Sequence, residues 1–164
     1  MATKISCVWG SVAAQSDCDV RVSVINHPLA NGERGVVFHD TTSNSSWEKS
    51  LISWGDAAMT LDESQSWIIH IVWPRYCRDQ DIVPLLANSF RNCVMLAEKH
   101  QQNSIALPAW EGSGPYRIPV YESSLLTIQT LRDCLPELKH LKEIRLVCPE
   151  DSVRLSYQLT LDNL

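Results

Sequence analysis

A glycine turn between an expected strand and an expected helix is the stretch best suited to bind an anion. Residues 104–107 form an apolar run of strand character, and the loop that follows carries Gly112, Ser113 and Gly114, with Pro119 just before a helical pattern. Backbone amides at such a turn and at the next helix N-terminus can point at one phosphate, because glycine accepts the required dihedrals and lets a ligand come close. The alternative is that these glycines only turn the chain.

Two further turns follow expected strands and are candidates for the same site. Residues 10–12, Gly-Ser-Val, come after the strand at 4–9, and a second glycine-bearing turn at 31–35 comes after the strand at 20–25. In open α/β sheets the ligand crevice lies beyond the carboxyl ends of the strands. We therefore expect these turns to line one cleft.

The order of the expected elements predicts an α/β fold. The expected strands are 4–9, 20–25, 57–61, 67–72, 104–107 and 143–148. The expected helices are 46–54, 81–100, 125–135 and a last one from about 149–152 to 161. The helix at 46–54 depends on the sequence Ser-Ser-Trp-Glu, which fits a capping box. Strands alternating with helices indicate a three-layer α/β/α sandwich with a mixed, mostly parallel central sheet.

The composition is that of one ordinary globular domain. The chain has 164 residues, 45% of them apolar and 20% charged, which predicts a single domain over residues 1–164. No apolar run approaches the ~20 residues that cross a bilayer, and the amino end lacks the apolar core of a secretory signal. An intracellular protein, cytoplasmic or nuclear, is therefore expected. The net charge of −5 makes nucleic acid an unexpected partner.

The cysteines and histidines do not indicate a metal or a redox site. The six cysteines show no Cys-x-x-Cys spacing, so we expect them to be reduced and structural. The five histidines share no ligand spacing, and His70, inside an apolar strand, is expected to be a hydrogen-bonded core residue. Gly112 to Gly114 is no serine-hydrolase elbow, because Glu111 stands where its first glycine belongs. No metal and no cofactor are expected.

Several segments, in order along the chain, carry a resemblance to a known family. Residues 55–60 read Gly-Asp-Ala-Ala-Met-Thr, residues 70–74 read His-Ile-Val-Trp-Pro, and the stretch 104–119 and a last helix bearing Tyr157 follow. These segments resemble the macro domain family, with its Gly-x-Ala-x-x-Thr and His-x-Val-x-Pro motifs. Members of that family bind ADP-ribose, and some remove it from modified targets. The resemblance covers nearly the whole chain and implies a single macro-like domain.

The resemblance also assigns ligand contacts. The family usually has Gly-Asp-Ile after the first strand, with the aspartate accepting a hydrogen bond from the adenine amino group; here Ser11 and Val12 stand in that place. Ser11 can accept a hydrogen bond but carries no charge. Asn26 matches the asparagine that contacts the distal ribose, and it is the best retained residue of catalytic type.

The first phosphate loop of the family has three or four glycines followed by a valine. Gly32, Gly35 and Val36 match it, whereas Glu33 and Arg34 bring in side chains. Arg34 can pair with phosphate, an interaction of about 1.5–3 kcal/mol. Glu33 repels the same phosphate unless Arg34 holds it aside.

The second phosphate loop of the family resembles residues 111–116. Pro115 removes one amide donor from it. Tyr116 and Trp110 are expected to stack on or shield a ribose, with ordinary packing at the cleft edge as the alternative for both. The remaining matched residues are Gly112, Ser113 and Gly114.

Two functions are expected. The first is a module that binds ADP-ribose or a related nucleotide diphosphate, free or on a modified macromolecule, with or without a weak ADP-ribosyl hydrolase activity. In that activity Asn26 would position a water against a substrate phosphate, and Glu33 is the candidate base. The second is a diverged macro fold without nucleotide binding that acts as a protein interaction or regulatory domain, a reading favoured by Ser11, Glu33 and Arg34.

Overall fold

A computed structural model describes residues 2–24, 35–40, 47–52, 54–62, 64–73, 83–110 and 119–164, with only the backbone for 35–40 and 47–51. The strands are β1 Lys4–Trp9, β2 Val20–Val24, β3 Gly35–Asp40, β4 Trp47–Ile52, β5 Ala57–Leu61, β6 Trp67–Ile71, β7 Ser104–Pro108 and β8 Glu143–Cys148. The helices are α1 Val83–Lys99, α2 Val120–Cys134 and α3 Asp151–Asn163, with short 3-10 turns η1 Val12–Ala14 and η3 Leu135–Glu137.

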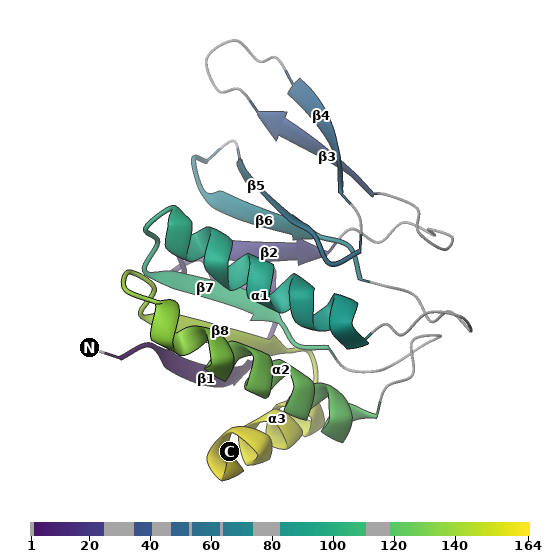
Figure 1. The fold of residues 1–164 in the computed structure, drawn as a ribbon, viewed down its shortest axis with the longest axis vertical. Coiled ribbons are helices and arrows are strands. Elements are labelled where there is room, and N and C mark those ends of the chain that lie inside the picture. Colours follow the sequence, from purple (N-terminus) through teal and green to yellow (C-terminus); the bar gives the residue numbers. More distant parts are fainter. Residues whose placement is uncertain are drawn as a thin grey trace.

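Six of these strands form one mixed sheet in the order β1-β8-β7-β2-β6-β5. β1, β8, β7, β2 and β6 run parallel, and β5 pairs antiparallel with β6. The predicted α/β fold with a mixed, mostly parallel sheet is therefore confirmed. The carboxyl ends of the parallel strands point to one side of the molecule, which is the right in Figure 1.

The main core lies between the helices and one face of the sheet. Alternate strand residues point to this face, and they include Val22, Ile69 and Leu107, which pack with Phe90 of α1 and Tyr157 of α3. Figure 1 shows α1 and α2 in front of the sheet, with α3 below them beside β1. Full burial of each large apolar side chain contributes about 1.5–3 kcal/mol, so this core holds the parallel strands in place.

A smaller apolar cluster occupies the opposite face, next to η1. Cys18, Ala106 and Val147 are buried there, and Val12 packs against them. Successive strand residues point to opposite faces, so Ala106 reaches this cluster while its neighbour Leu107 reaches the main core. The cluster fixes the turn that follows β1.

The prediction of a helix at residues 46–54 is wrong. The structure has β4 there, in an antiparallel pair with β3 that runs from Gly35 opposite Ile52 to Asp40 opposite Trp47. Residues 35–40 read Gly-Val-Val-Phe-His-Asp, and valine and phenylalanine favour strands. A helix cap is worth about 1 kcal/mol, which a ladder of this length outweighs. Figure 1 shows the hairpin standing beyond β5.

Candidate functional site

The carboxyl ends of β1, β8 and β7 are tied together by backbone hydrogen bonds. The amide of Gly10 donates to the carbonyl of Cys148 at 2.9 Å, and the amide of Ala109 donates to the carbonyl of Val147 at 3.0 Å. Both bonds extend the ladder beyond the strands themselves. We call the ends of these strands, from Gly10 through Cys148 to Ala109, the rim; these hydrogen bonds fix its backbone.

The strands that precede the two expected phosphate loops are neighbours. β2 pairs in parallel with β7 through Val20 opposite Ile105 and Arg21 opposite Ala106. The segments that follow these strands, 25–34 and 111–118, lie outside the described residues, so their ligand contacts stay predictions. β2 and β7 themselves run parallel, so their carboxyl ends point to the same edge of the sheet, as one shared cleft requires. The candidate residues in these segments are Asn26, Gly32, Glu33, Arg34, Gly112, Ser113, Gly114 and Tyr116.

Gly35 and Val36, expected at the end of the first phosphate loop, open β3. Gly35 pairs with Ile52, and Val36 pairs with Leu51. In the sequence the first loop is followed directly by this hairpin. The contact of Gly35 and Val36 with phosphate stays a prediction.

The side chain of Ser11 stabilises the turn after β1. Ser11 is the N-cap of η1, and its Oγ accepts a hydrogen bond from the amide of Ala14 at 3.3 Å. Gly10 has a φ of +147°, which glycine adopts without strain. Ser11 is exposed at the rim, whereas Val12 is half-buried behind it.

Trp9, the last residue of β1, presents an aromatic surface at the same rim. It is 66% exposed, and its Nε1 donates a hydrogen bond to the carbonyl of Pro149 at 3.3 Å. Trp9 was predicted only as the end of a strand, and its exposure was not predicted. The available signal was an aromatic residue directly before a glycine turn.

Trp110 belongs to the core rather than to an open cleft wall. Its ring is 5% exposed and meets Trp73 edge-on, with the ring centroids 4.9 Å apart. This geometry supports the packing alternative for Trp110. Its carbonyl accepts hydrogen bonds from the hydroxyl of Tyr157 at 2.6 Å and from Oγ of Ser123 at 3.1 Å. The backbone just before residue 111 is thereby anchored to both α2 and α3.

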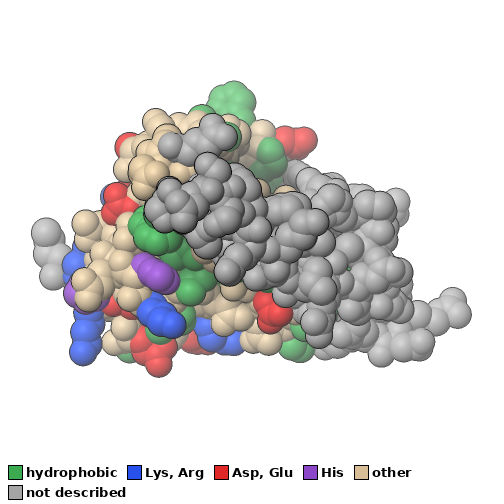
Figure 2. Space-filling view, turned by 90° about the horizontal axis from the view of Figure 1, so that it is seen from above, with side chains coloured by type: hydrophobic (Ala, Val, Ile, Leu, Met, Phe, Trp, Pro, Cys, Tyr) green, Lys and Arg blue, Asp and Glu red, His purple; other side chains and the backbone are tan. Residues whose placement is uncertain are grey.

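Charged side chains in the first half of β8 and in the segment after η1 are paired with one another. Arg145 of β8 contacts Asp17 and Glu143, each at 2.9 Å, and the hydrogen bond with Asp17 raises the pKa of the arginine above its ordinary value. This pair braces the segment after η1 against β8. On the face drawn in Figure 2, acidic and basic side chains are interspersed.

Within the described ranges, no group of three or more His, Cys, Asp and Glu side chains could hold a metal ion. His70 is half-buried and hydrogen-bonded, with its Nε2 2.7 Å from Oγ1 of Thr60. No helix in this part of the chain is both long and apolar enough to span a membrane. The free cysteines of the described residues are Cys7, Cys18, Cys93, Cys134 and Cys148.

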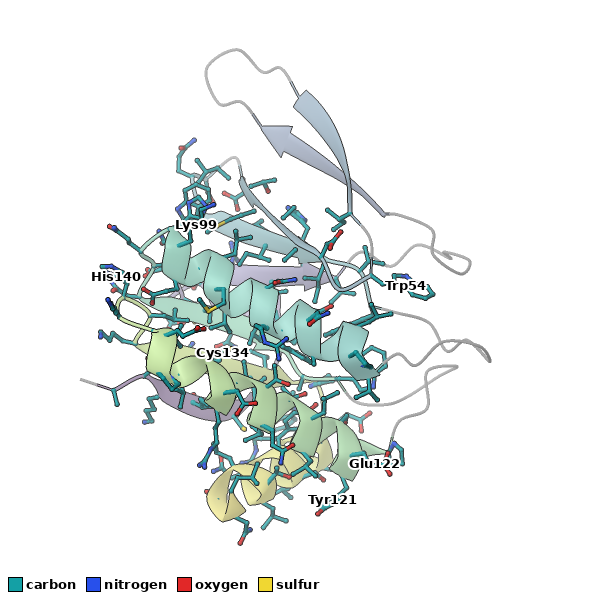
Figure 3. The ribbon with its side chains drawn as sticks, viewed as in Figure 1. Trp54, Lys99, Tyr121, Glu122, Cys134 and His140 are labelled. Carbon is teal, nitrogen blue, oxygen red and sulfur yellow. The ribbon has the colours of Figure 1, made fainter. Side chains whose placement is uncertain are left out.

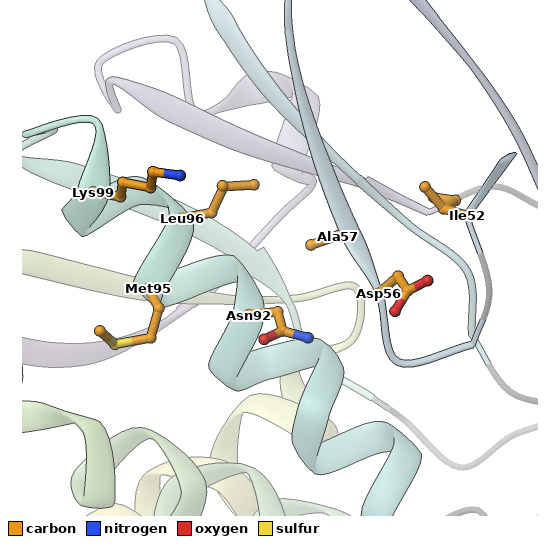
Figure 4. A pocket seen from close by; sticks show the side chains of 7 residues that line it. All are labelled: Ile52, Asp56, Ala57, Asn92, Met95, Leu96 and Lys99. Carbon is orange, nitrogen blue, oxygen red and sulfur yellow. The ribbon is translucent and has the colours of Figure 1, made fainter. Parts of the chain in front are cut away.

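A separate hollow of about 380 Å³ lies between α1, β5 and the end of β4 (Figure 4). Asp56 and Lys99 stand toward its two ends. Asn92, in its wall, donates a hydrogen bond from Nδ2 to the carbonyl of Gly55 at 2.7 Å, which ties α1 to the turn before β5. None of the residues that line this hollow was predicted as a site residue.

A sequence profile of the macro domain matches residues 35–126, more than half of the chain. This chain belongs to the macro domain family. The matched range includes β3, β7 and the second glycine turn, but it does not reach Ser11 or Asn26. The resemblance carried by the motifs is thus confirmed.

Solved macro domains share the fold. The Oceanobacillus iheyensis macrodomain with MES bound superposes with a TM-score of 0.73 at 20% identity, over 99% of this chain and 92% of that chain. The same macrodomain with ADP gives a TM-score of 0.60 at 26% identity, over 67% of this chain and 58% of that chain. An O-acetyl-ADP-ribose deacetylase of Cronobacter sakazakii is 32% identical over 95 residues, which are 57% of this chain and 52% of that protein. The chain spans about half the length of the curated relatives it matches.

Proposed function

We propose that this macro domain binds ADP-ribose or a related nucleoside diphosphate at the carboxyl ends of β2 and β7. The observation that carries the proposal is the pairing of these two strands. Because the two strands are parallel, both carboxyl ends point to the edge where open α/β sheets bind ligands, and the glycine-bearing segments follow these ends in the sequence. The similarity to a macrodomain solved with ADP supports a diphosphate as the ligand.

The proposed recognition uses backbone amides for the phosphates and side chains for the ribose. The amides around Gly32 and Gly112 would point at the phosphate oxygens. Arg34 would add a charge-assisted hydrogen bond, and Asn26 would contact the terminal ribose. Because the carbonyl of Trp110 is anchored, the second turn starts from a fixed position, and this lowers the ordering cost of binding.

Calorimetry and thermal unfolding with ADP-ribose test this function. A ligand that binds only the native state stabilises it by RT ln(1 + [L]/Kd), about 2.7 kcal/mol at a hundredfold excess over Kd. We expect binding heat and a raised Tm at millimolar ADP-ribose, and neither with ribose alone. Absence of both effects would remove the nucleotide proposal.

The contribution of Arg34 can be measured in the same assay. Arg34→Ala should weaken ADP-ribose binding by about tenfold or more, because a charge-assisted hydrogen bond is lost. Arg91→Ala is the matched control, since Arg91 lies on α1 and bonds within its own helix to Asn88. Equal affinity of the two variants would show that Arg34 does not touch phosphate.

A hydrolase step is a separate part of the proposal. It is supported by the similarity to a protein named as an O-acetyl-ADP-ribose deacetylase. Asn26 would hold the attacking water and Glu33 would act as base. Release of ADP-ribose from a modified protein should be lost in Asn26→Ala, and an unchanged rate would exclude that role.

The alternative function is a protein interaction domain that has lost the nucleotide. Ser11, Glu33, Arg34 and Pro115 favour it, because each departs from the family pattern within a ligand loop. Failure of ADP-ribose to bind in the calorimetric test would select this alternative.

A further inference from the structure

The outer side of α3 carries two exposed leucines in one stripe. Leu155 and Leu159 are 50% and 64% exposed, and they stand about one helical turn apart, on the side of α3 that faces away from the buried Val153 and Tyr157. Single exposed leucines are common on proteins. Two in one stripe, beside a hollow with apolar walls, form a patch of the kind that marks a contact site.

A hollow of about 390 Å³ lies beside this stripe, between α2 and α3. Its apolar lining comes from Tyr121 and Leu125 of α2, from Leu159 and from Leu164. Tyr121 is 70% exposed, and Figure 3 shows it at the lower end of the molecule, beside α3. Leu155 does not line this hollow but precedes Leu159 by about 6 Å along the helix axis. The same surface therefore has a projecting leucine and an open hollow next to each other.

A second copy of this chain fits both features at once. Two α3 helices can pack antiparallel about a two-fold axis level with residue 157, the midpoint between Leu155 and Leu159. This arrangement places Leu155 of each copy level with Leu159 of the other. Each Leu155 then enters the other copy's hollow, beside Leu159 and Tyr121. A two-fold interface uses the same patch on both subunits, so this contact is made twice.

The charges beside the stripe also match in this arrangement. Arg154 and Asp162 lie on the same flank of the stripe, three residues before and five residues after its midpoint. Antiparallel packing brings Arg154 of one copy to within about 3 Å of the level of Asp162 of the other. Nε of Arg154 contacts Asp151 at 2.6 Å, and the guanidinium carries further donors. Asp162 accepts a hydrogen bond from Gln158 with one carboxylate oxygen, and a carboxylate has two.

We propose that α3 is the interface of a two-fold dimer in which Leu155 of each copy fills the hollow beside Leu159 of the other. The proposal goes beyond nucleotide binding and does not depend on it. α3 has 13 residues and is therefore about 20 Å long. An interface of this length lies at the small end of the range for specific contacts between proteins, so the dissociation constant should be on the order of 10 μM.

Sedimentation velocity of the full chain without nucleotide tests the dimer. Between about 1 and 300 μM, the sedimentation coefficient should rise from the value of a monomer to that of a dimer and then level off, because a two-fold contact closes on itself. A monomer at every concentration would overturn the proposal. Continued growth beyond a dimer would overturn the two-fold arrangement.

Substitution of the inserted side chain tests the contact itself. Leu155→Ala should weaken self-association by about tenfold or more, because the leucine is lost from both halves of the interface. Val83→Ala is the matched control, since Val83 is also an exposed apolar residue at the start of a helix, 41% exposed at the start of α1, and should associate as the native chain does. Equal association of the two variants, with circular dichroism confirming the fold of each, would show that Leu155 is not in the interface.

A charge exchange tests the antiparallel register. Asp162→Lys should weaken self-association by about two- to fivefold, because the new lysine would face Arg154 of the other copy. Addition of Arg154→Glu in the same chain should restore the association, since opposite charges meet again. Further weakening in the double variant would show that these two positions do not meet and would overturn the proposed register.

The failure of this inference can be told apart from the failure of the proposed function, because self-association is measured without nucleotide. If ADP-ribose binds and the chain remains a monomer, the proposed function stands and the dimer is overturned. If the chain dimerises and ADP-ribose does not bind, the dimer stands and the proposed function falls.

Discussion

At the scale of single residues, Trp110, which precedes the second glycine turn in the sequence, is held by side chains from two helices. Tyr157 and Ser123 both donate to the carbonyl of Trp110, and the side chain of Tyr157 is fully buried. Burial raises the pKa of Tyr157 above its ordinary value, so the hydroxyl remains a donor at physiological pH. Tyr157 and Trp110 are 47 positions apart, which is why sequence patterns do not reveal the pair.

Removal of this hydroxyl should weaken both the fold and the site. Tyr157→Phe should lower the free energy of unfolding by about 0.5–1.5 kcal/mol, the usual value of one hydrogen bond, because Ser123 still serves the carbonyl. ADP-ribose affinity should fall as well, since the turn loses an anchor. Urea denaturation and calorimetry measure the two effects. Tyr121→Phe, at an exposed tyrosine, is the control, and equal results for the two variants would contradict the anchoring role.

At the scale of elements, apolar patterns predicted most of what the structure contains. The strands at 4–9 and 143–148 have the expected bounds. The helical stripe expected within 81–100 is the buried face of α1, with Leu86, Phe90, Cys93 and Ala97 all buried. These predictions succeed because an element that is buried on one face has apolar residues at regular intervals in its sequence.

The failure at 46–54 has a different physical origin. A capping box reports only on local hydrogen bonds, whereas β4 exists through its pairing with β3. Nothing in the sequence of either segment shows that the two segments pair with each other. The sequence therefore indicated a local structure that a non-local ladder overrides.

The turn that leads into β8 is held by a carboxylate from α1. Oε1 of Glu98 accepts hydrogen bonds from the amides of Lys139 at 3.0 Å, His140 at 2.9 Å and Leu141 at 3.0 Å. Figure 3 shows His140 near the end of α1 that carries Lys99. Partial burial raises the pKa of Glu98, but the three amides lower it more, so the pKa lies below its ordinary value.

This carboxylate should make stability depend on pH. A group whose pKa falls on folding stabilises the protein above the unfolded value, about 4.3 for glutamate, and loses that effect as pH falls through the folded value. Glu98→Gln should cost a few tenths to about 1 kcal/mol at pH 7, because the partial exposure of Glu98 lets solvent weaken these hydrogen bonds, and the cost should shrink below about pH 4. Urea denaturation from pH 7 to 3 measures it, with the exposed Glu137→Gln as control. A cost that is constant over this range would contradict the assignment.

At the scale of the whole molecule, the direction of the strands was more predictable than the exposure of single side chains at their ends. Parallel strands bring their carboxyl ends to one edge, so the order of elements was enough to expect one cleft there. The exposure of Trp9 and the burial of Trp110 arise from the packing of distant segments. The resemblance gave an aromatic role to Trp110 and Tyr116, with packing as the alternative; Trp110 is buried, and Tyr116 lies outside the described residues.

The main core joins the sheet to all three helices, and this continuity predicts that residues 1–164 unfold as one domain. Leu131→Ala removes a fully buried side chain from α2 and should cost about 2–5 kcal/mol. Leu155→Ala makes the same change on α3 at a residue that is 50% exposed, and it should stay within about 0.5 kcal/mol. Both variants should unfold in a single transition by calorimetry and by circular dichroism. Two separate transitions in Leu131→Ala would show that the chain does not fold as one unit.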